Sequence, residues 1–240
     1  PKGGVGKTTL ATMLGTLLSQ VRNDRVVAID ADPDYGTLGR VLGTPDAVQV
    51  DELLEVLEQP ALTVSMLDRF LGRGPHGLMV LPGPTDEDRM ETLDGEAYRR
   101  VIRRLEDLVG IVVVDCGPGV LSPPVRAALE SADQVVIVTD SDPTTASLVA
   151  QAAMRLPEGT DYVIVVNKAP RGRPGLNLDN FREDVGRARM LVQVEGDAVA
   201  AGRLAQGRFD WDSAPGSWQV EIRELAAGLV SGWEQLGLAG

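Results

Sequence analysis

The first nine residues of the chain hold two of its three lysines inside a glycine-rich run, Pro1-Lys2-Gly3-Gly4-Val5-Gly6-Lys7-Thr8-Thr9. The other twenty basic residues are all arginine. An ammonium is a compact point charge, and it suits a phosphate that is bound by glycine-rich backbone. The ending Gly6-Lys7-Thr8 matches the Walker A pattern, in which backbone N–H groups wrap the phosphates, the lysine contacts them and the hydroxyl binds Mg²⁺. We therefore expect the phosphates to be bound by Gly3, Gly4, Val5, Gly6, Lys7, Thr8 and Thr9.

The residues after this loop have the spacing of an amphipathic helix. Between Thr9 and Gln20, apolar side chains recur at i, i+3, i+4, i+7 and i+8, namely Leu10, Met13, Leu14, Leu17 and Leu18. A helix that begins at a glycine loop directs its free N–H groups and the positive end of its dipole at a bound anion. Loop and helix together favour a P-loop over the alternative reading, a flexible glycine loop with stray lysines.

The loop departs from the general pattern at two positions. Pro1 stands where the pattern has its first glycine, and Lys2 adds a second lysine. This deviant Walker A motif resembles that of the MinD/ParA family of P-loop ATPases, and the resemblance extends over nearly the whole chain. It implies ATP and Mg²⁺ as ligands. It also implies a homodimer that sandwiches ATP, in which Lys2 of each subunit reaches the phosphates bound by the other.

Composition and apolar patterning predict the fold class. With 240 residues, 43% of them apolar, the chain is long enough for one α/β domain, and we expect residues 1–240 to form a single P-loop ATPase domain. Helical patterns separate six continuous apolar runs, which are typical of strands covered on both faces. The expected fold is a doubly wound, mostly parallel sheet with helices on both faces, and the resemblance implies the SIMIBI type of P-loop NTPase. The runs are 26–29, 78–81, 111–114, 135–138, 163–166 and 191–194.

The start of the sequence leads to a further expectation. A P-loop follows an apolar strand, and no residue precedes Pro1 in this sequence. We therefore expect an N-terminally truncated segment, whose first strand and any regulatory N-terminal region lie outside it. Because the loss of a strand buried on both faces leaves ladder groups unpaired, we expect this segment to fold poorly.

Acidic residues follow two of the predicted strands, at the edge where open parallel sheets bind ligands. The run 111–119 looks like a Walker B strand that leads into a switch loop. There Asp115 is expected to hold Mg²⁺ through water together with Thr8, and Gly117 to let the backbone approach the γ-phosphate. The alternative reading of the run is a buried strand capped by an Asp before a Gly-Pro turn.

The segment Ile29-Asp30-Ala31-Asp32-Pro33 resembles the switch I segment of the same family. The resemblance implies that Asp32 orients or activates the attacking water, while Lys2, Lys7 and Mg²⁺ stabilise charge on the phosphate oxygens. Lys2, Lys7 and Asp32 are thus the expected catalytic residues. Asp30 is expected to support the outer shell of the metal. A simple Asp-Pro turn is the alternative.

The third lysine lies in Asn167-Lys168-Ala169-Pro170, which is similar to the start of the guanine-reading Asn-Lys-x-Asp signature of GTPases. Pro170 replaces the deciding Asp. Because an amide can serve the donor and acceptor edge of adenine, we expect Asn167 to contact the base and ATP to be bound rather than GTP. The family has a second base loop with Pro-x-Asp, and here Glu195-Gly196-Asp197 keeps the Asp, so Asp197 is expected to contribute as well.

Charge and composition restrict the expected partners. A net charge of −12 argues against general binding to DNA or to anionic lipid, and we expect the arginines between 99 and 104 to form a solvated helix face. The lone Cys116 excludes a disulfide framework and suits a reducing cytoplasm. The apolar stripe over 222–233 has an acidic polar face, so we expect it to pack on the domain and not to bind a membrane. Recruitment to a membrane or a cell pole would then depend on partners.

These residues lead to one functional hypothesis and two alternatives. The hypothesis is an ATP-dependent dimerisation switch with slow hydrolysis, which works with a protein partner or activator and controls the positioning or assembly of a complex in secretion, cell division, flagellar placement or partition. The runs 115–119 and 132–136 look most similar to the actinobacterial MinD-like ATPases associated with specialised secretion. The alternatives are a nucleotide-binding scaffold without significant hydrolysis and a DNA-segregating ParA-type ATPase.

Overall fold

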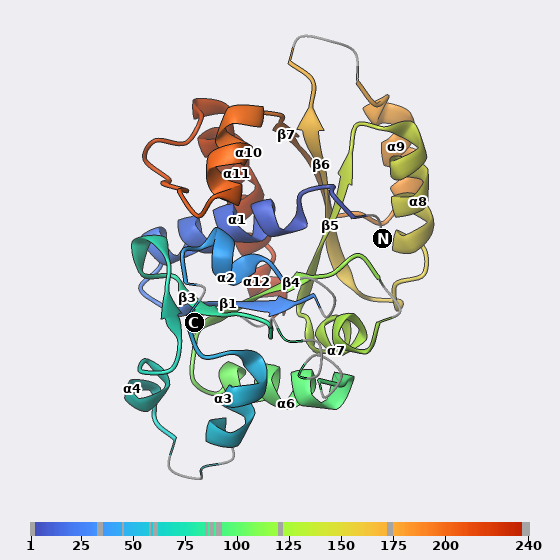
Figure 1. Ribbon diagram of the computed structural model, residues 1–240. Coiled ribbons are helices and arrows are strands. Elements are labelled where there is room, and N and C mark those ends of the chain that lie inside the picture. Colours follow the sequence, from blue (N-terminus) through green and yellow to red (C-terminus); the bar gives the residue numbers. More distant parts are fainter. Residues whose placement is uncertain are drawn as a thin grey trace. The chain divides into compact units, whose positions relative to one another are not determined.

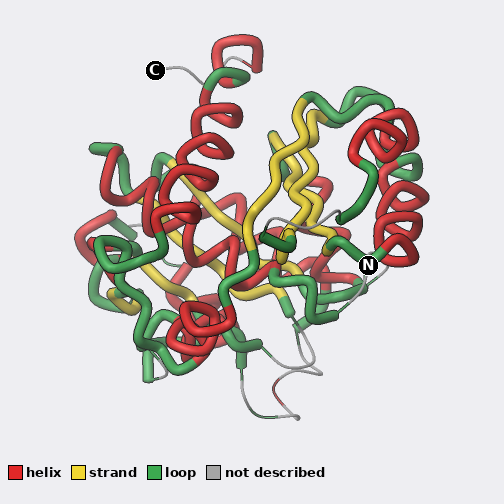
Figure 2. The backbone as a smooth tube through the Cα atoms, turned by 90° about the horizontal axis from the view of Figure 1, so that it is seen from above, coloured by secondary structure: helices red, strands yellow, loops and turns green. Residues whose placement is uncertain are grey.

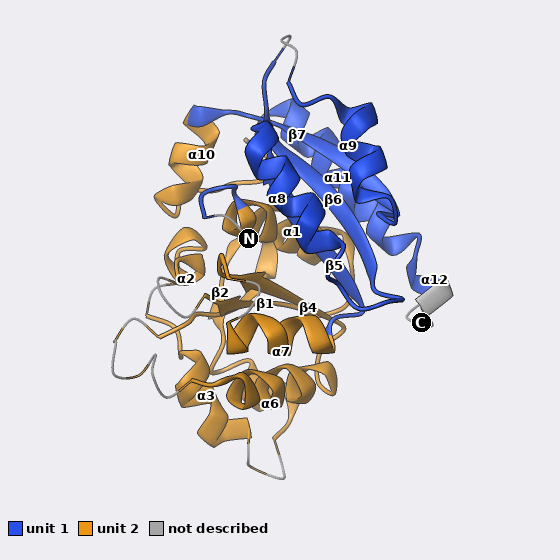
Figure 3. Cartoon of the chain, turned by 90° about the vertical axis from the view of Figure 1, so that its right-hand side faces the viewer, with its two compact units in different colours: residues 1–6, 132–198, 214–240 blue, residues 7–131, 199–213 orange. Residues whose placement is uncertain are grey.

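The computed structural model describes residues 3–32, 36–44, 46–57, 59, 62–84, 86, 89, 93–119, 122–171 and 175–236. Lys2 and Pro33 lie outside the described residues. The chain forms two compact units, which are treated separately (Figure 3). Unit 1 comprises residues 1–6, 132–198 and 214–240, and unit 2 comprises residues 7–131 and 199–213. The prediction of a single domain stays a prediction.

Unit 2 is built on a mostly parallel sheet with the strand order β2-β3-β1-β4. Strand β1 pairs in parallel with β3 and β4, and the two-residue β2 pairs antiparallel with β3. Three of the predicted apolar runs are confirmed as strands in this sheet, whereas the sequence did not predict β2. The bounds are β1 Val26–Ala31, β2 Gly72–Arg73, β3 Met79–Leu81 and β4 Ile111–Cys116.

Helices cover both faces of this sheet, as predicted (Figure 1). Helix α1 contacts β1 and β4 on the face that also carries α2, whereas α7 and α6 contact the sheet from the opposite face and α3 packs on α6. The five apolar residues of the predicted stripe in α1 are all buried. The bounds are α1 Lys7–Val21, α2 Leu38–Val41, α3 Val50–Leu57, α4 Val64–Leu67, η1 Pro75–Gly77, α6 Gly95–Glu106, α7 Pro123–Ser131 and α10 Ala198–Ala205.

Unit 1 contains a parallel sheet with the order β5-β6-β7. Alternate residues of β6, among them Tyr162, Ile164 and Val166, pack with α8 and α9, and α11 contacts β7. Figure 2 shows the strands of the chain in yellow and its helices in red. The predicted C-terminal stripe packs on this unit, because Ile222 and Leu225 of α11 are fully buried. The bounds are β5 Gln134–Asp140, β6 Asp161–Ala169, β7 Met190–Glu195, α8 Pro143–Ala153, α9 Leu178–Val185, α11 Gly216–Val230 and α12 Trp233–Leu236.

Strands β4 and β5 differ from the central strands in their burial. Within the ladders formed by the described residues, β4 pairs only with β1, and β5 only with β6. The apolar side chains over 111–114 and 135–137 are half-buried, whereas those of β1 are fully buried. The expected further strand before the P-loop stays a prediction.

No helix in the described part of the chain combines the length and the apolar character that crossing a bilayer requires.

Asp161, at the start of β6, joins the neighbouring strands of unit 1. Its Oδ1 accepts a hydrogen bond from Arg189 Nε at 2.8 Å, and its Oδ2 accepts one from Gln134 Nε2 at 2.7 Å. Gln134 Oε1 in turn accepts from Trp233 Nε1 at 3.0 Å. Burial opposes ionisation of Asp161, but the hydrogen bonds from Arg189 and Gln134 outweigh it and hold the pKa below its usual value. One carboxylate therefore connects the starts of all three strands.

Replacement of this carboxylate tests its contribution to stability. At pH 7 we expect Asp161→Ala to lower the free energy of unfolding by about 1–3 kcal/mol, because Arg189 and Gln134 lose a partly buried partner. The lowered pKa means that the contribution exists above the unfolded-state pKa and is lost as the pH falls through the folded-state value. The measurement is urea unfolding at pH 7 and pH 3, with Glu158→Ala, an exposed position nearby, as control. Equal midpoints for Asp161→Ala and wild type at pH 7 would contradict this role.

Candidate functional site

The glycine-rich turn has the backbone conformation that its composition predicts. Gly4 and Gly6 have φ values of 77° and 98°, in the left-handed region that glycine adopts readily. A Cβ at Gly4 would meet no atom within 4 Å, so the dihedral angle and not a lack of space requires glycine there. Gly3 and Gly4 are exposed, Val5 is buried, and α1 begins at Lys7. The exposed backbone of this turn is available to an anion.

Asn167 lies at the carboxyl end of β6 in unit 1 and contacts the turn directly. Its side chain is 5% exposed, and its Nδ2 donates to the carbonyl oxygen of Val5 at 2.8 Å. The sequence predicted a base contact for this amide and missed the contact with the loop, which lies 162 positions away. Because one amide N–H is already bound, the base contact stays a prediction that rests on the remaining polar atoms of Asn167.

The second predicted base loop follows β7 in the same unit. Trp218 Nε1 donates to the Glu195 carbonyl oxygen at 2.7 Å, and the Glu195 N–H donates to Glu221 Oε2 at 2.9 Å. A proline at position 195 would have no N–H for Glu221. The hydrogen bond from the Glu195 N–H to Glu221 is therefore a structural reason for the departure from Pro-x-Asp. Helix α11 holds the backbone of Glu195, and the half-buried Asp197 follows two residues later.

In unit 2, two carboxylates lie side by side at the ends of adjacent strands. Asp30 of β1 and Asp115 of β4 are register partners, and they are 1% and 4% exposed. Asp30 accepts a hydrogen bond from Asp32 N at 3.1 Å on Oδ1 and one from Leu38 N at 3.0 Å on Oδ2. Asp115 is hydrogen-bonded to Thr8 and lies near the charge of Lys7. The structure thus brings together four residues that the sequence assigned to phosphate and metal binding.

The surroundings of both carboxylates disfavour their charged forms. Burial raises the pKa of Asp115 to about 7, with a further contribution from the charge of Asp30, against the opposing effects of Thr8 and Lys7. Burial likewise raises the pKa of Asp30 to about 6, although its backbone hydrogen bonds oppose the shift. A divalent cation would stabilise the ionised forms, and Mg²⁺ prefers the carboxylate and hydroxyl oxygens that Asp115 and Thr8 provide. Both oxygens of Asp30 are engaged, which suits a supporting role better than a direct ligand.

Asp32 and Gly117 lie against each other where the loops after β1 and β4 meet. A Cβ at Gly117 would stand 2.9 Å from Asp32 Oδ1 and 3.2 Å from Asp32 Cα, so only glycine fits without displacing the carboxylate. Gly36 is a further residue of the site that the sequence did not predict, because a Cβ there would lie 2.6 Å from Asp30 Oδ2. Its signal in the sequence was a glycine shortly after the expected switch I segment.

Comparison with known proteins identifies the family. Residues 1–183 match the CobQ/CobB/MinD/ParA nucleotide binding domain. The chain belongs to this family. The resemblance to MinD/ParA proteins in the sequence is thereby confirmed, together with the α/β fold class.

Two relatives of this chain differ in how much of it they match. The ESX-1 secretion-associated protein EspI of Mycobacterium tuberculosis is 27% identical and is aligned with 98% of this chain, which spans 36% of that protein's length. The chromosome partitioning protein ParA of Caulobacter vibrioides is 35% identical over 57% of the chain, and that match covers 52% of ParA. The chain thus spans about a third to a half of these two relatives.

Solved structures have the same fold as this chain. A ParA family ATPase from Chlorobium tepidum superposes with a TM-score of 0.81 at 20% identity, over 95% of each chain. The septum site-determining protein MinD from Pyrococcus horikoshii, solved in complex with Mg-ADP, gives 0.79 at 20% identity over 95% of this chain and 92% of MinD.

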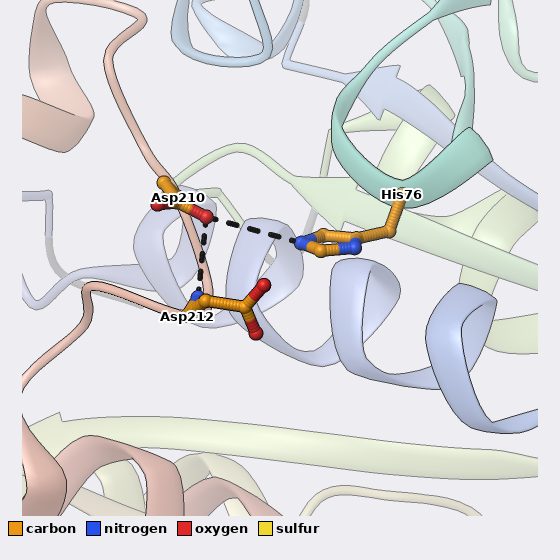
Figure 4. A group of neighbouring side chains, drawn as sticks. All are labelled: His76, Asp210 and Asp212. Atoms are coloured by element: carbon orange, nitrogen blue, oxygen red, sulfur yellow. Dashed lines mark hydrogen bonds and ion pairs between the residues drawn. The ribbon is translucent and has the colours of Figure 1, made fainter.

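A further group of polar side chains of this chain lies on the surface of unit 2, apart from the predicted motifs. His76, Asp210 and Asp212 each offer a ligand atom within 4.8 Å of the others, and all three are exposed (Figure 4). His76 has a φ of 54°, in the left-handed region. Its Nε2 is 4.0 Å from Asp210 Oδ1, and Asp210 Oδ1 also accepts from Asp212 N at 3.2 Å. These two contacts explain why the three side chains lie close together, and no bound ion is needed to explain it.

The buried carboxylate pair makes the free energy of unfolding of this chain depend on pH. Because the folded-state pKa of Asp115 is raised, its charge destabilises the fold increasingly as the pH rises from about 4 to 7. In the absence of nucleotide and Mg²⁺, we therefore expect Asp115→Asn to raise the free energy of unfolding at pH 8 by about 1–3 kcal/mol, and to change it little at pH 4.5. Urea unfolding at both pH values, with the exposed Asp46→Asn as control, measures this effect. Destabilisation by Asp115→Asn at pH 8 would show that the ionised carboxylate is well compensated.

Proposed function

We propose that this chain is an ATP-dependent dimerisation switch, which hydrolyses ATP slowly with Mg²⁺ and controls the positioning or assembly of a partner complex. The observation that carries the proposal is the group formed by Lys7, Thr8 and Asp115 in unit 2. A lysine and a hydroxyl at the first turn of α1 lie beside a buried carboxylate at a strand end, where metal and phosphate groups are bound in P-loop proteins. Membership of the nucleotide binding family supports the same assignment.

Each residue of the site has a proposed chemical role. Lys7 would bind the β- and γ-phosphate oxygens, and Thr8 and Asp115 would hold Mg²⁺, Asp115 through water. The ion, when bound, neutralises phosphate charge. Asp32 orients the attacking water and accepts its hydrogen bond or proton, and its carboxylate already lies against Gly117 of the second switch loop. Asp30 fixes the start of switch I through the N–H groups of Asp32 and Leu38.

The proposed nucleotide, dimer and partner each rest on a different observation. ATP is favoured over GTP because Pro170 stands where a guanine-reading Asp would be needed, while Asn167 and Asp197 provide polar groups for adenine. The homodimer rests on Lys2 and on the family resemblance. A role in secretion, with the protein in the cytoplasm and recruited to a membrane or cell pole by partners, is supported by the similarity to a protein named as ESX-1 secretion-associated.

DNA segregation is the alternative that a specific comparison favours, since one relative is a chromosome partitioning protein. The charges of the chain favour it less. Its net charge is −12, and Arg99 of the arginine-bearing helix α6 is already paired with Glu96 and Glu130. DNA binding by this chain is therefore not part of the proposal.

The role of Asp32 can be separated from nucleotide binding. We expect Asp32→Ala to lower ATP hydrolysis by about 10²-fold or more, because the attacking water loses its acceptor, and to leave the dissociation constant of a non-hydrolysable ATP analogue nearly unchanged. Phosphate release and analogue binding are measured in the full-length protein, with the exposed Asp46→Ala as control. If the wild type releases no phosphate even with lipid, DNA or a partner present, the scaffold alternative is correct.

Lys2 tests dimerisation independently of hydrolysis. With the non-hydrolysable analogue and Mg²⁺, we expect light scattering to give the molar mass of a dimer for the wild-type full-length protein and of a monomer for Lys2→Ala. Lys7→Ala is expected to abolish analogue binding altogether, and the exposed Arg187→Ala serves as a control for the removal of one cation. Dimerisation and hydrolysis at wild-type levels in Lys2→Ala would exclude a lysine acting across the dimer.

A further inference from the structure

We infer that Lys168 is a positioning residue, which holds the carbonyl of Gly4 and thereby orients the backbone N–H groups of the phosphate loop. The inference rests on the proposed nucleotide binding, to which it adds the residue that fixes the loop in its binding shape. All the contacts involved lie within unit 1.

Two successive residues of β6 hold two successive carbonyls of the loop. Lys168 Nζ donates to the Gly4 carbonyl oxygen at 2.5 Å, and Asn167 Nδ2 donates to the Val5 carbonyl oxygen at 2.8 Å. The ammonium makes the first of these a charge-assisted hydrogen bond, which is stronger than one between neutral groups. The loop is therefore held at two adjacent peptide groups, by residues far away in the sequence.

Planar peptide geometry explains how these contacts act on a ligand. In a trans peptide, the C=O and the following N–H point in opposite directions. The carbonyls of Gly4 and Val5 point toward β6, so the N–H groups of Val5 and Gly6 point away from it. These are the groups that a phosphate-binding loop presents to an anion. Loss of the Lys168 contact would leave the peptide between Gly4 and Val5 free to rotate, since its flanking glycine tolerates several conformations.

The backbone at Lys168 is shaped for this contact. Its φ is 57°, and His76 is the only other non-glycine residue with positive φ in the described part of the chain. The ladder between β6 and β7 shifts here, because Val166 pairs with Gln193 while Ala169 pairs with Glu195, which leaves an extra residue on β6. Gly196 makes room for this bulge, as a Cβ there would lie 3.3 Å from Lys168 Cα. A left-handed residue other than glycine costs about 1–2 kcal/mol, so the conformation points to a role for the side chain.

The choice of lysine fits the acceptor. The chain uses arginine for twenty of its twenty-three basic residues, yet has lysine at this position. A single carbonyl oxygen needs one compact donor, whereas a guanidinium is planar and suited to two parallel hydrogen bonds. We therefore expect arginine to replace Lys168 only in part.

Hydrogen exchange of the full-length protein without nucleotide tests the inference directly. We expect Lys168→Met to accelerate exchange of the amides in residues 5–8 by about threefold to tenfold, which is the effect of losing one net hydrogen bond. Lys168→Gly should accelerate it equally, because glycine keeps the left-handed backbone and lacks the ammonium. Lys168→Arg should lie between these variants and the wild type, and the exposed Arg182→Met of α9 should match the wild type.

Binding of Mg²⁺-ADP, measured by calorimetry, provides the second readout. The dissociation constant should rise by a similar threefold to tenfold in Lys168→Met and Lys168→Gly, with no change in Arg182→Met. Wild-type exchange rates at residues 5–8 in both Lys168 variants would overturn the inference, and so would acceleration in Lys168→Met alone, which would assign the effect to the backbone. If the wild type binds no nucleotide, the proposed function fails, while the exchange rates still decide whether Lys168 holds the loop.

Discussion

The burial of two carboxylates side by side is the constraint on which the rest of the site depends. Strands β1 and β4 run parallel in a register that places Asp30 opposite Asp115, and both side chains are almost inaccessible to solvent. Such a pair is unfavourable unless it is hydrogen-bonded or paired with positive charge. The surrounding residues meet this need. Asp30 receives backbone N–H groups, its own carbonyl oxygen accepts from the buried Tyr98 at 3.2 Å, and Asp115 has Thr8 and Lys7 as neighbours.

This arrangement accounts for several glycines as well. Residues 36–38 lie against Asp30, to which the Leu38 N–H donates, and only a residue without a side chain fits at Gly36. The loop after β4 must pass Asp32 closely, and Gly117 permits that approach. A nucleotide switch needs two loops that respond together to the state of the phosphates. In this chain both loops begin at the carboxylate pair, so a change in the proposed metal ion would reach both of them.

The sequence predicted the parts of the fold that depend on local patterns. Continuous apolar runs located β1 and β3 to β7, and helical spacing located the buried stripes of α1 and α11. It missed β2, because two residues show no periodicity. At the site, the motifs named Lys7, Thr8 and Asp115, which the structure brings together, and their roles stay predictions. Contacts between distant segments could not be predicted. The hydrogen bonds of Asn167 and Lys168 to the loop depend on how β6 ends, and the bulge there comes from pairing with β7. The replacement of the family's proline by Glu195 likewise became intelligible only beside Glu221 and Trp218.

The carboxylate pair is proposed to form part of a site for a metal-bound nucleotide, and proton release on binding tests this proposal most directly. Asp115 and Asp30, with pKa values near 7 and 6, are partly protonated at pH 6.5 and must lose those protons when a divalent cation arrives. Calorimetry of Mg²⁺-ADP binding in two buffers of different ionisation enthalpy measures this release. We expect roughly half a proton to one proton to be released per nucleotide at pH 6.5, and the release nearly to disappear at pH 8.5. Binding heats that are identical in the two buffers at pH 6.5 would contradict it.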